Sequence, residues 1–367
     1  MHLIVDAHED LAWNIRTFGR DYTRGAHETR LLEAGGVAPR VNGDTLLGYP
    51  DYQRGRVGIV FATLFAAPVR AKLDESDTQV YQTAEEARDL YRAQMDIYQR
   101  LVETHPETFC LVGTASDLGA QLSAWTGRPE PLDGDTGLPV GLVPLMEGAE
   151  CITRLEELED WWERGVRIIG PAWKGNRFCG GTREPGPLTA EGFALLEAMA
   201  ALGFTLDLSH MDRVAALQAL EQYEGPIIAS HANALRLVKG SESNRHLSDE
   251  VIEGTIARGG VIGIVPFNRF LVNGWTDKDP RQDVPLDLVA AQLDYVCQKA
   301  GNARHAALGT DFDGGFGVQE SPDGIDTIAD LHQLVPLLEA RGYNDEDVAA
   351  IFGGNWIQHL KSSLPNE

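Results

Sequence analysis

The sequence predicts a closed (β/α)8 barrel, the α/β fold also called a TIM barrel. Its 367 residues suit eight β/α units with their loops. Short apolar runs alternate with amphipathic stretches, the pattern of a parallel sheet that is covered by helices. Histidine and carboxylate residues directly follow several of the runs, and barrel enzymes place their active sites at those strand ends.

The expected strands are short, nearly continuous apolar runs, because a parallel strand is buried on both faces. Their number favours a closed barrel over an open sheet. We expect strands at residues 3–7, 57–65, 140–146, 166–171, 205–208, 226–229, 260–266 and 305–309.

Stretches with helical periodicity lie between and after these runs. Segments 23–56 and 272–284 are rich in glycine, proline and polar residues and are predicted to be long loops. No repeat or change in composition divides the chain, so one domain over residues 1–367 is predicted. We expect helices at residues 83–103, 152–163, 189–202, 211–222, 248–258, 286–299, 327–341 and 345–361.

The formal net charge of −24 argues against a nucleic acid or an anionic membrane as partner. Four widely spaced cysteines without a CxxC pair are typical of reduced thiols, and no apolar run is long enough to span a membrane. The amino terminus does not resemble a signal peptide. We therefore predict a cytoplasmic protein with a small-molecule substrate, and a homodimer is left open.

Residues that commonly bind metals follow the expected strands. Two of them are separated by one residue, so their side chains share one face of a strand. The coincidence of so many at one end of a barrel predicts a joint site. The candidates are His8 and Asp10 after the first strand, Glu147 after the third, His210 after the fifth, His231 after the sixth and Asp311 after the eighth.

Imidazoles and carboxylates without thiolates suit zinc, with manganese, cobalt or iron as alternatives. Five ligands shared by two ions leave coordination positions for water, and Glu147 is the candidate bridge because it comes from a middle strand. Two such ions would activate water and stabilise an oxyanion. Asp311 is not needed as a ligand and could move a proton from that water to a leaving group.

Motifs along almost the whole chain are similar to those of the renal (membrane) dipeptidases, a branch of the amidohydrolase superfamily. They are residues 6–11 (DAHEDL), 147–148 (EG), 188–192 (LTAEG), 206–210 (LDLSH), 230–231 (SH), 309–314 (GTDFDG) and 353–355 (GGN).

This resemblance implies an amidohydrolase-like barrel that cleaves the peptide bond of short dipeptides with two Zn²⁺ ions per chain. It implies one ion on His8 and Asp10, the other on His210 and His231, and Glu147 as the bridge. It further implies that Asp311 is the proton shuttle and that Arg245 binds the substrate carboxylate. A guanidinium suits that last role because it can donate two parallel hydrogen bonds.

One residue departs from the family pattern. After the fourth strand, mammalian members carry a histidine that polarises the scissile carbonyl, and the matching residue here is Trp173. An indole donates one hydrogen bond, but it can neither take up a proton nor carry a charge. Lys174, Asn176 or His246 could supply the missing donor, and the substrate need not be a simple L,L-dipeptide.

Two other functions remain open. One is hydrolysis of another amide or ester, such as an N-acyl amino acid, a lactone or a phosphotriester. The phosphotriester branch fits poorly, because it opens with His-x-His and bridges its metals through a carboxylated lysine. The other is a metal-binding member without turnover, against which Asp311 argues, because a binding protein needs no proton shuttle.

Overall fold

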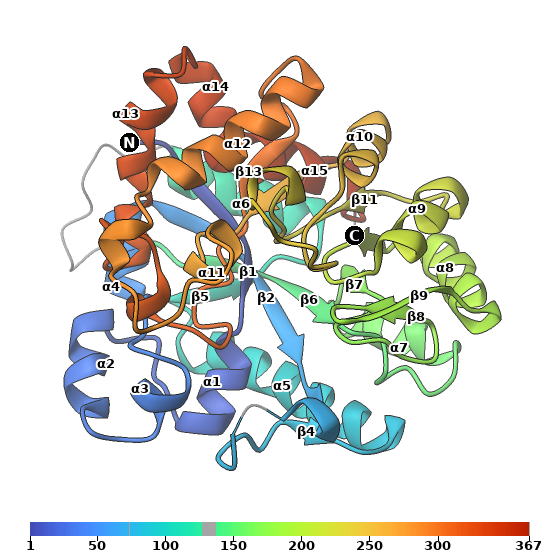
Figure 1. Cartoon of the computed structure of the whole chain (residues 1–367). Helices are drawn as coiled ribbons and strands as arrows, with labels where there is room; N and C mark the ends of the chain where they lie inside the picture. The colour runs from blue at the N-terminus through green and yellow to red at the C-terminus, as the bar shows by residue number, and fades with distance from the viewer. Residues whose placement is uncertain (73, 127–136, 367) are drawn as a thin grey trace.

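The structure is a computed structural model that describes residues 1–72, 74–126 and 137–366. The single domain predicted for residues 1–367 extends over residues 73, 127–136 and 367, which lie outside the described residues. Strands form the centre of the molecule and helices surround them (Figure 1). Each of the eight expected apolar runs contains a strand.

Most of these strands form one parallel sheet. Its ladder runs in the order β1, β2, β6, β7, β10 and β11, and a short unpredicted strand, β5, pairs with β6. A separate parallel pair consists of β12 and β13. The bounds are β1 Ile4–Glu9, β2 Val57–Phe65, β5 Phe109–Leu111, β6 Val140–Glu147, β7 Ile168–Gly170, β10 Thr205–Asp207, β11 Ile227–Ile228, β12 Ile262–Ile264 and β13 Ala306–Leu308.

Single bridges connect the two sheets. Ala229, just after β11, bridges to Ile262 of β12, and Glu9 at the end of β1 bridges to Phe312 beyond β13. The continuous ladder itself stops at β11. The structure thus shows an α/β fold whose parallel sheet forms a half-barrel, and full closure stays a prediction.

Helices follow the strands, and several begin at a side chain that accepts a hydrogen bond from the first turn. Thr83 forms a reciprocal capping box with Glu86, and Thr189, Asp212 and Ser248 cap α8, α9 and α10. The helices are α1 Leu11–Phe18, α2 Ala26–Glu33, α3 Ala38–Val41, α4 Tyr49–Gly55, α5 Ala84–Thr104, α6 Ala115–Thr126, α7 Glu157–Glu163, α8 Ala190–Leu202, α9 Arg213–Gln222, α10 Asp249–Ala257, α11 Asn268–Leu271, α12 Asp287–Ala300, α13 Leu334–Glu339, α14 Asp345–Ala349 and α15 Asn355–Ser363.

The predicted loop over residues 23–56 is wrong, because it contains α2, α3 and α4. Its prolines lie in the first turns of α3 and α4, where a missing backbone N–H removes no helical hydrogen bond. A tertiary contact also holds the segment, since buried Asp51 accepts a hydrogen bond from the backbone N–H of Ala26 at 2.7 Å. Segment 272–284 is the loop that the sequence predicts, apart from a 3₁₀ turn at Arg281–Asp283.

Two small sheets were not predicted. Strands β3 (Ala67–Pro68) and β4 (Val80–Tyr81) pair in parallel, and β8 (Cys179–Gly181) and β9 (Glu184–Leu188) form an antiparallel hairpin (Figure 1). Glycine and proline have low strand propensity, so the hairpin gives no strand pattern in the sequence. Within the described residues, no helix is long and apolar enough to cross a membrane.

Candidate metal centre

The candidate ligands meet at the carboxyl ends of the parallel strands. Glu147 is the last residue of β6, and His8 lies near the end of β1. The ligand atoms of each of three groups lie within 4.8 Å of one another, and Glu147 belongs to two of these groups. The groups are His8, Asp10 and Glu147; Glu147, His210 and His231; and His8, His231 and Asp311.

The two oxygens of Glu147 face different histidines. Its Oε1 is 3.0 Å from Nε2 of His210 and 3.3 Å from Nε2 of His231. Its Oε2 is 3.6 Å from Nε2 of His8, which itself lies 3.8 Å from Oδ2 of Asp10. The carboxylate of Glu147 thus lies between two candidate ligand pairs, which are His8 with Asp10 and His210 with His231.

The residues fit a divalent cation. Both ring nitrogens of buried His8 and Oδ1 of Asp10 have no hydrogen-bond partner among the described residues. Burial raises the pKa of Asp10 to about 7 and that of Glu147 to about 8, and it lowers the pKa of His210 and His231. Buried charges are costly without partners, and cations bound here would supply them.

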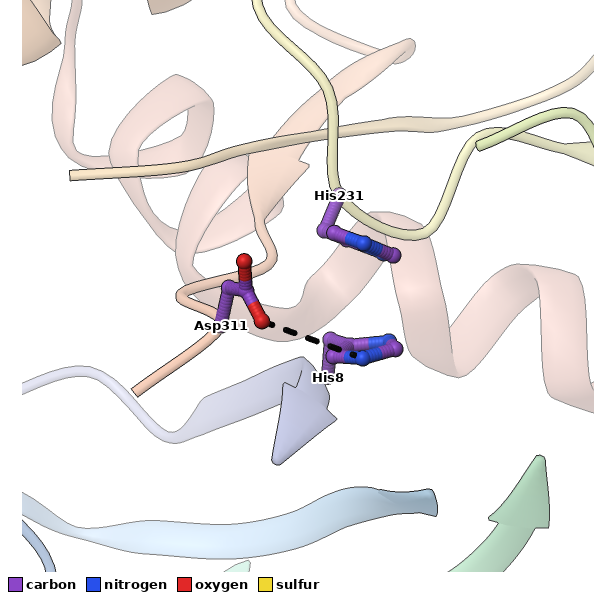
Figure 2. A group of neighbouring side chains, drawn as sticks. All are labelled: His8, His231 and Asp311. Carbon is purple, nitrogen blue, oxygen red and sulfur yellow. Dashed lines mark ion pairs between the residues drawn. The ribbon is translucent and has the colours of Figure 1, made fainter. Parts of the chain in front are cut away.

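Asp311 lies beside His8 and His231, with Oδ1 3.9 Å from Nε2 of His8 (Figure 2). The rings of the two histidines lie almost over each other, with centroids 3.7 Å apart. Burial raises the pKa of Asp311 well above its usual value, and His8 opposes that shift. The carboxyl group is therefore next to the ligands, where it could hold a proton or join one ion.

Hydrogen bonds behind the ligands orient two of the histidines. Nδ1 of His231 lies 2.8 Å from Oγ of Ser230, whose hydroxyl donates to Asp207. Asp207 also accepts the backbone N–H of Ser230 at 2.8 Å. Nδ1 of His210 lies 2.9 Å from Oγ1 of Thr182. In both rings the hydroxyl contact leaves Nε2 directed at Glu147.

Almost the whole sequence matches one protein family. The family is described as membrane dipeptidase, peptidase family M19, and the match extends over residues 1–363. The chain belongs to the membrane dipeptidase family. Family membership confirms the expected activity class, a metal-dependent dipeptidase.

Two individual proteins are similar to this chain, and one of them is named a dipeptidase. Dipeptidase ataJ of Aspergillus terreus is 27% identical over 98% of this chain and 84% of its own length. An uncharacterized protein from the pqqA 5′ region of Klebsiella pneumoniae is 33% identical over 56% of this chain and 75% of its own length.

Solved structures share the fold. A metallopeptidase of Rhodobacter sphaeroides, bound to a phosphinate mimic of the dipeptide L-Ala-D-Ala, has a TM-score of 0.77 at 20% identity and covers 99% of both chains. The probable dipeptidase PvdM of Pseudomonas aeruginosa also has a TM-score of 0.77 at 20% identity, over 99% of this chain and 95% of its own.

In this membrane dipeptidase, Arg245 lies next to the second ligand pair. Its side chain is buried, and Nη2 donates to the backbone oxygen of His231 at 2.8 Å. The guanidinium packs over Phe270 at 5.0 Å from the ring centroid. Its Nε and Nη1 have no partner in the part of the chain that the structure describes, so two donors stay free for a ligand.

The neighbouring His246 packs edge-on against the same Phe270, with ring centroids 5.4 Å apart. Burial, aided by the charge of Arg245, lowers the pKa of His246 to about 4, so the ring is neutral near pH 7. Its Nδ1 is buried without a described hydrogen-bond partner. His246 therefore keeps an unused polar atom beside the predicted carboxylate clamp.

Trp173 lies beside the candidate ligand His210. Its ring packs on Phe65, at the end of β2, with centroids 4.9 Å apart, and lies 6.2 Å from the ring of His210. The ammonium of Lys174 sits 5.3 Å from the centroid of the same indole. Trp173 thus forms a flat wall next to one ligand pair.

Asn176 is not brought into the site as a free donor. Its amide donates to Oε2 of Glu150 at 2.9 Å and to the backbone oxygen of Pro171 at 2.8 Å. Its Oδ1 accepts the backbone N–H groups of Phe178 and Cys179 at 2.8 and 3.1 Å. Both amide protons are engaged, so the side chain organises the loop after β7.

Sequence reasoning gave no role to Thr182 or Asp313. Asp313 is fully buried and accepts hydrogen bonds from Nη1 of Arg20 at 3.0 Å, from the hydroxyl of Tyr22 at 2.8 Å and from the backbone of Leu46 at 3.0 Å. It thereby fixes the segment that carries Asp311. Its signal was its place in the GTDFDG motif, whereas Thr182 stands in no recognisable motif.

Proposed function

We propose that the chain hydrolyses dipeptides at a binuclear zinc centre formed by five residues. The placement of Glu147 carries this proposal, because its two oxygens face separate ligand pairs. Imidazole and carboxylate donors without thiolates suit zinc. When bound, such ions supply Lewis-acid chemistry that makes water a nucleophile at neutral pH. The ligands are His8, Asp10, Glu147, His210 and His231.

Asp311 is the proposed proton carrier. Its carboxylate would take the proton of the attacking water and deliver it to the amino group that leaves when the peptide bond breaks. The position beside His8 and His231 supports this role.

Arg245 is the proposed clamp for the carboxylate of the substrate. A buried, rigidly held guanidinium can donate two parallel hydrogen bonds to a carboxylate, here from the unpaired Nε or Nη1 together with the second N–H of Nη2. Trp173 bounds the space beside His210 and is proposed to restrict the substrate there. Because both amide protons of Asn176 are used, we propose His246 or Lys174 as the donor to the scissile carbonyl.

We further propose that the barrel closes. The bridges Ala229–Ile262 and Glu9–Phe312 support closure, as does the hydrogen bond from the backbone N–H of Asp311 to the oxygen of His8 at 3.1 Å. A second core cluster also supports it, with Val5, Phe61, Val143, Ile228 and Ala307 among its members. These residues come from strands on both sides of the gap in the ladder, as the packed interior of a barrel requires.

A cytoplasmic location is proposed from the free cysteines Cys110, Cys151, Cys179 and Cys297. The homodimer remains a prediction. Zinc-loaded protein assayed on L,L- and L,D-dipeptides, with N-acyl amino acids as the alternative substrates, tests the function. Cleavage of at least one dipeptide class supports the proposal. Turnover of N-acyl amino acids alone would replace it with the broader amidohydrolase function.

A further inference from the structure

We propose that Thr182 is a positioning residue that fixes the metal-binding form of His210 and joins it to the wall formed by Trp173. The inference rests on the proposed metal centre. Thr182 lies in the turn of the hairpin of β8 and β9, outside the parallel sheet. Its Oγ1 is 2.9 Å from Nδ1 of His210.

The hydroxyl selects one tautomer of His210. Thr182 Oγ1 can donate its single proton to the backbone oxygen of His210, which lies 3.5 Å away. The lone pair that faces Nδ1 then accepts a proton from that nitrogen. With the proton on Nδ1, Nε2 carries the lone pair, and it is Nε2 that lies 3.0 Å from Oε1 of Glu147. This is the tautomer that a metal ligand needs.

The same contacts support an unusual backbone. His210 has a φ of 67°, in the left-handed region that residues other than glycine rarely adopt. Such a conformation persists only where its surroundings hold it. The hydroxyl of Thr182 contacts both the ring and the carbonyl of His210, so it restrains the side chain and the backbone together.

The hairpin turn is itself tightly held. The backbone N–H of Thr182 donates to the oxygen of Trp173 at 2.9 Å. On the other side, the amide of Asn244 donates to the oxygen of Gly181 at 3.0 Å and accepts the N–H of Arg183 at 2.8 Å. One turn thus connects the Trp173 wall, the ligand His210 and the residue that precedes the clamp Arg245.

The other histidine ligands do not depend on this hairpin. Nδ1 of His231 is held by Ser230, which donates to Asp207 within the sheet. His8 has no hydrogen-bond partner for either ring nitrogen among the described residues. Removing the hydroxyl of Thr182 should therefore weaken the binding of the ion at His210 and leave the binding of the other ion unchanged.

The test compares Thr182→Val, which keeps the shape but lacks the hydroxyl, with Thr182→Ser, which keeps the hydroxyl. Glu184→Gln is the matched control, because Glu184 lies in the same hairpin and pairs with Arg70 at 2.7 Å, away from His210. Metal-free proteins are titrated with Zn²⁺ against a chromophoric chelator, and their thermal unfolding is recorded. Thr182→Ala replaces the valine variant if that variant does not fold.

We expect Thr182→Val to weaken one zinc-binding step by about 10- to 100-fold and leave the other unchanged. Thr182→Ser and Glu184→Gln should bind like the wild type. At saturating zinc, kcat of the valine variant should fall while KM changes little, because the backbone bond to Trp173 remains. Wild-type affinity for both ions in Thr182→Val, or equal losses in the serine variant, would overturn the inference. Absence of zinc binding in the wild type would instead refute the proposed metal centre.

Discussion

Replacing Arg245 by alanine should impair substrates with a free carboxylate far more than amidated analogues. The side chain is 3% exposed, and its Nε and Nη1 are the donors without a described partner. A charge-assisted hydrogen bond contributes about 1.5–3 kcal/mol. Two such bonds correspond to a loss of about 10²- to 10⁴-fold in kcat/KM for the free acid.

The third nitrogen of the Arg245 guanidinium, Nη2, already has a partner in the protein. Nη2 donates to the backbone oxygen of His231, so the truncation also disturbs a proposed metal ligand. That disturbance acts on both substrate types, and the ratio of the two losses therefore isolates the clamp. The assay measures kcat/KM for paired free and amidated dipeptides, together with the zinc content of each variant.

Two further variants complete the comparison. Arg245→Lys keeps the positive charge but lacks the planar pair of N–H donors. Its kcat/KM for the free acid should lie between those of the wild type and the alanine variant. Arg236→Ala removes an exposed arginine nearby in the sequence and should change nothing. Equal losses on free and amidated substrates at unchanged zinc content would refute the carboxylate clamp.

Asp311→Asn should keep its metal yet lose about 10²- to 10⁴-fold in kcat, and loss of zinc in that variant would make Asp311 a ligand instead. Trp173→His should broaden the range of dipeptides without a large gain in kcat on the best one; a rise of about 10²-fold or more would show that the wild type lacks a substitute donor, since such a donor is commonly worth about 3–4 kcal/mol. Buried His359 has its pKa lowered by burial to about 4. Because the unfolded chain binds this proton first as the pH falls, metal-free wild type should lose about 2 kcal/mol more stability than His359→Gln between pH 7 and pH 5. Urea unfolding at both pH values checks this, and equal losses would mean that His359 is not neutral in the folded state.

The sequence predicted the parallel strands well because burial on both faces leaves a simple pattern. The run 57–65 contains no charged residue and is β2 throughout, with every residue buried. Helix α5 was equally clear, since Thr83 and Glu86 form a capping box at its start. Both signals are local, so they need no knowledge of the fold.

Elements held by tertiary contacts were harder to predict. Helices α2 and α4 lie in a segment rich in glycine and proline, and Asp51 of α4 stabilises the start of α2. The predicted helix over residues 152–163 begins only at Glu157, whose carboxylate accepts the backbone N–H of Thr153 at 3.0 Å. Periodicity does not record such side-chain bonds.

In the site as well, residues with a local sequence signal were predicted and residues placed by tertiary contacts were missed. The candidate ligands could be predicted because each lies at or just beyond the carboxyl end of a strand, and parallel strands end at one face. Thr182 was missed because it lies in a hairpin of low strand propensity and reaches His210 only through the fold. The sequence suggested Asn176 as a donor, but the structure shows that its amide protons bind Glu150 and Pro171.

The metal content of the wild type and of Glu147→Ala tests the central claim most directly. Metal-free protein is reloaded with zinc, freed of excess by gel filtration and analysed for zinc per chain. Because the oxygens of Glu147 face both ligand pairs, the wild type should hold about two ions and the variant should lose at least one. Full occupancy in Glu147→Ala would contradict the bridged two-metal centre.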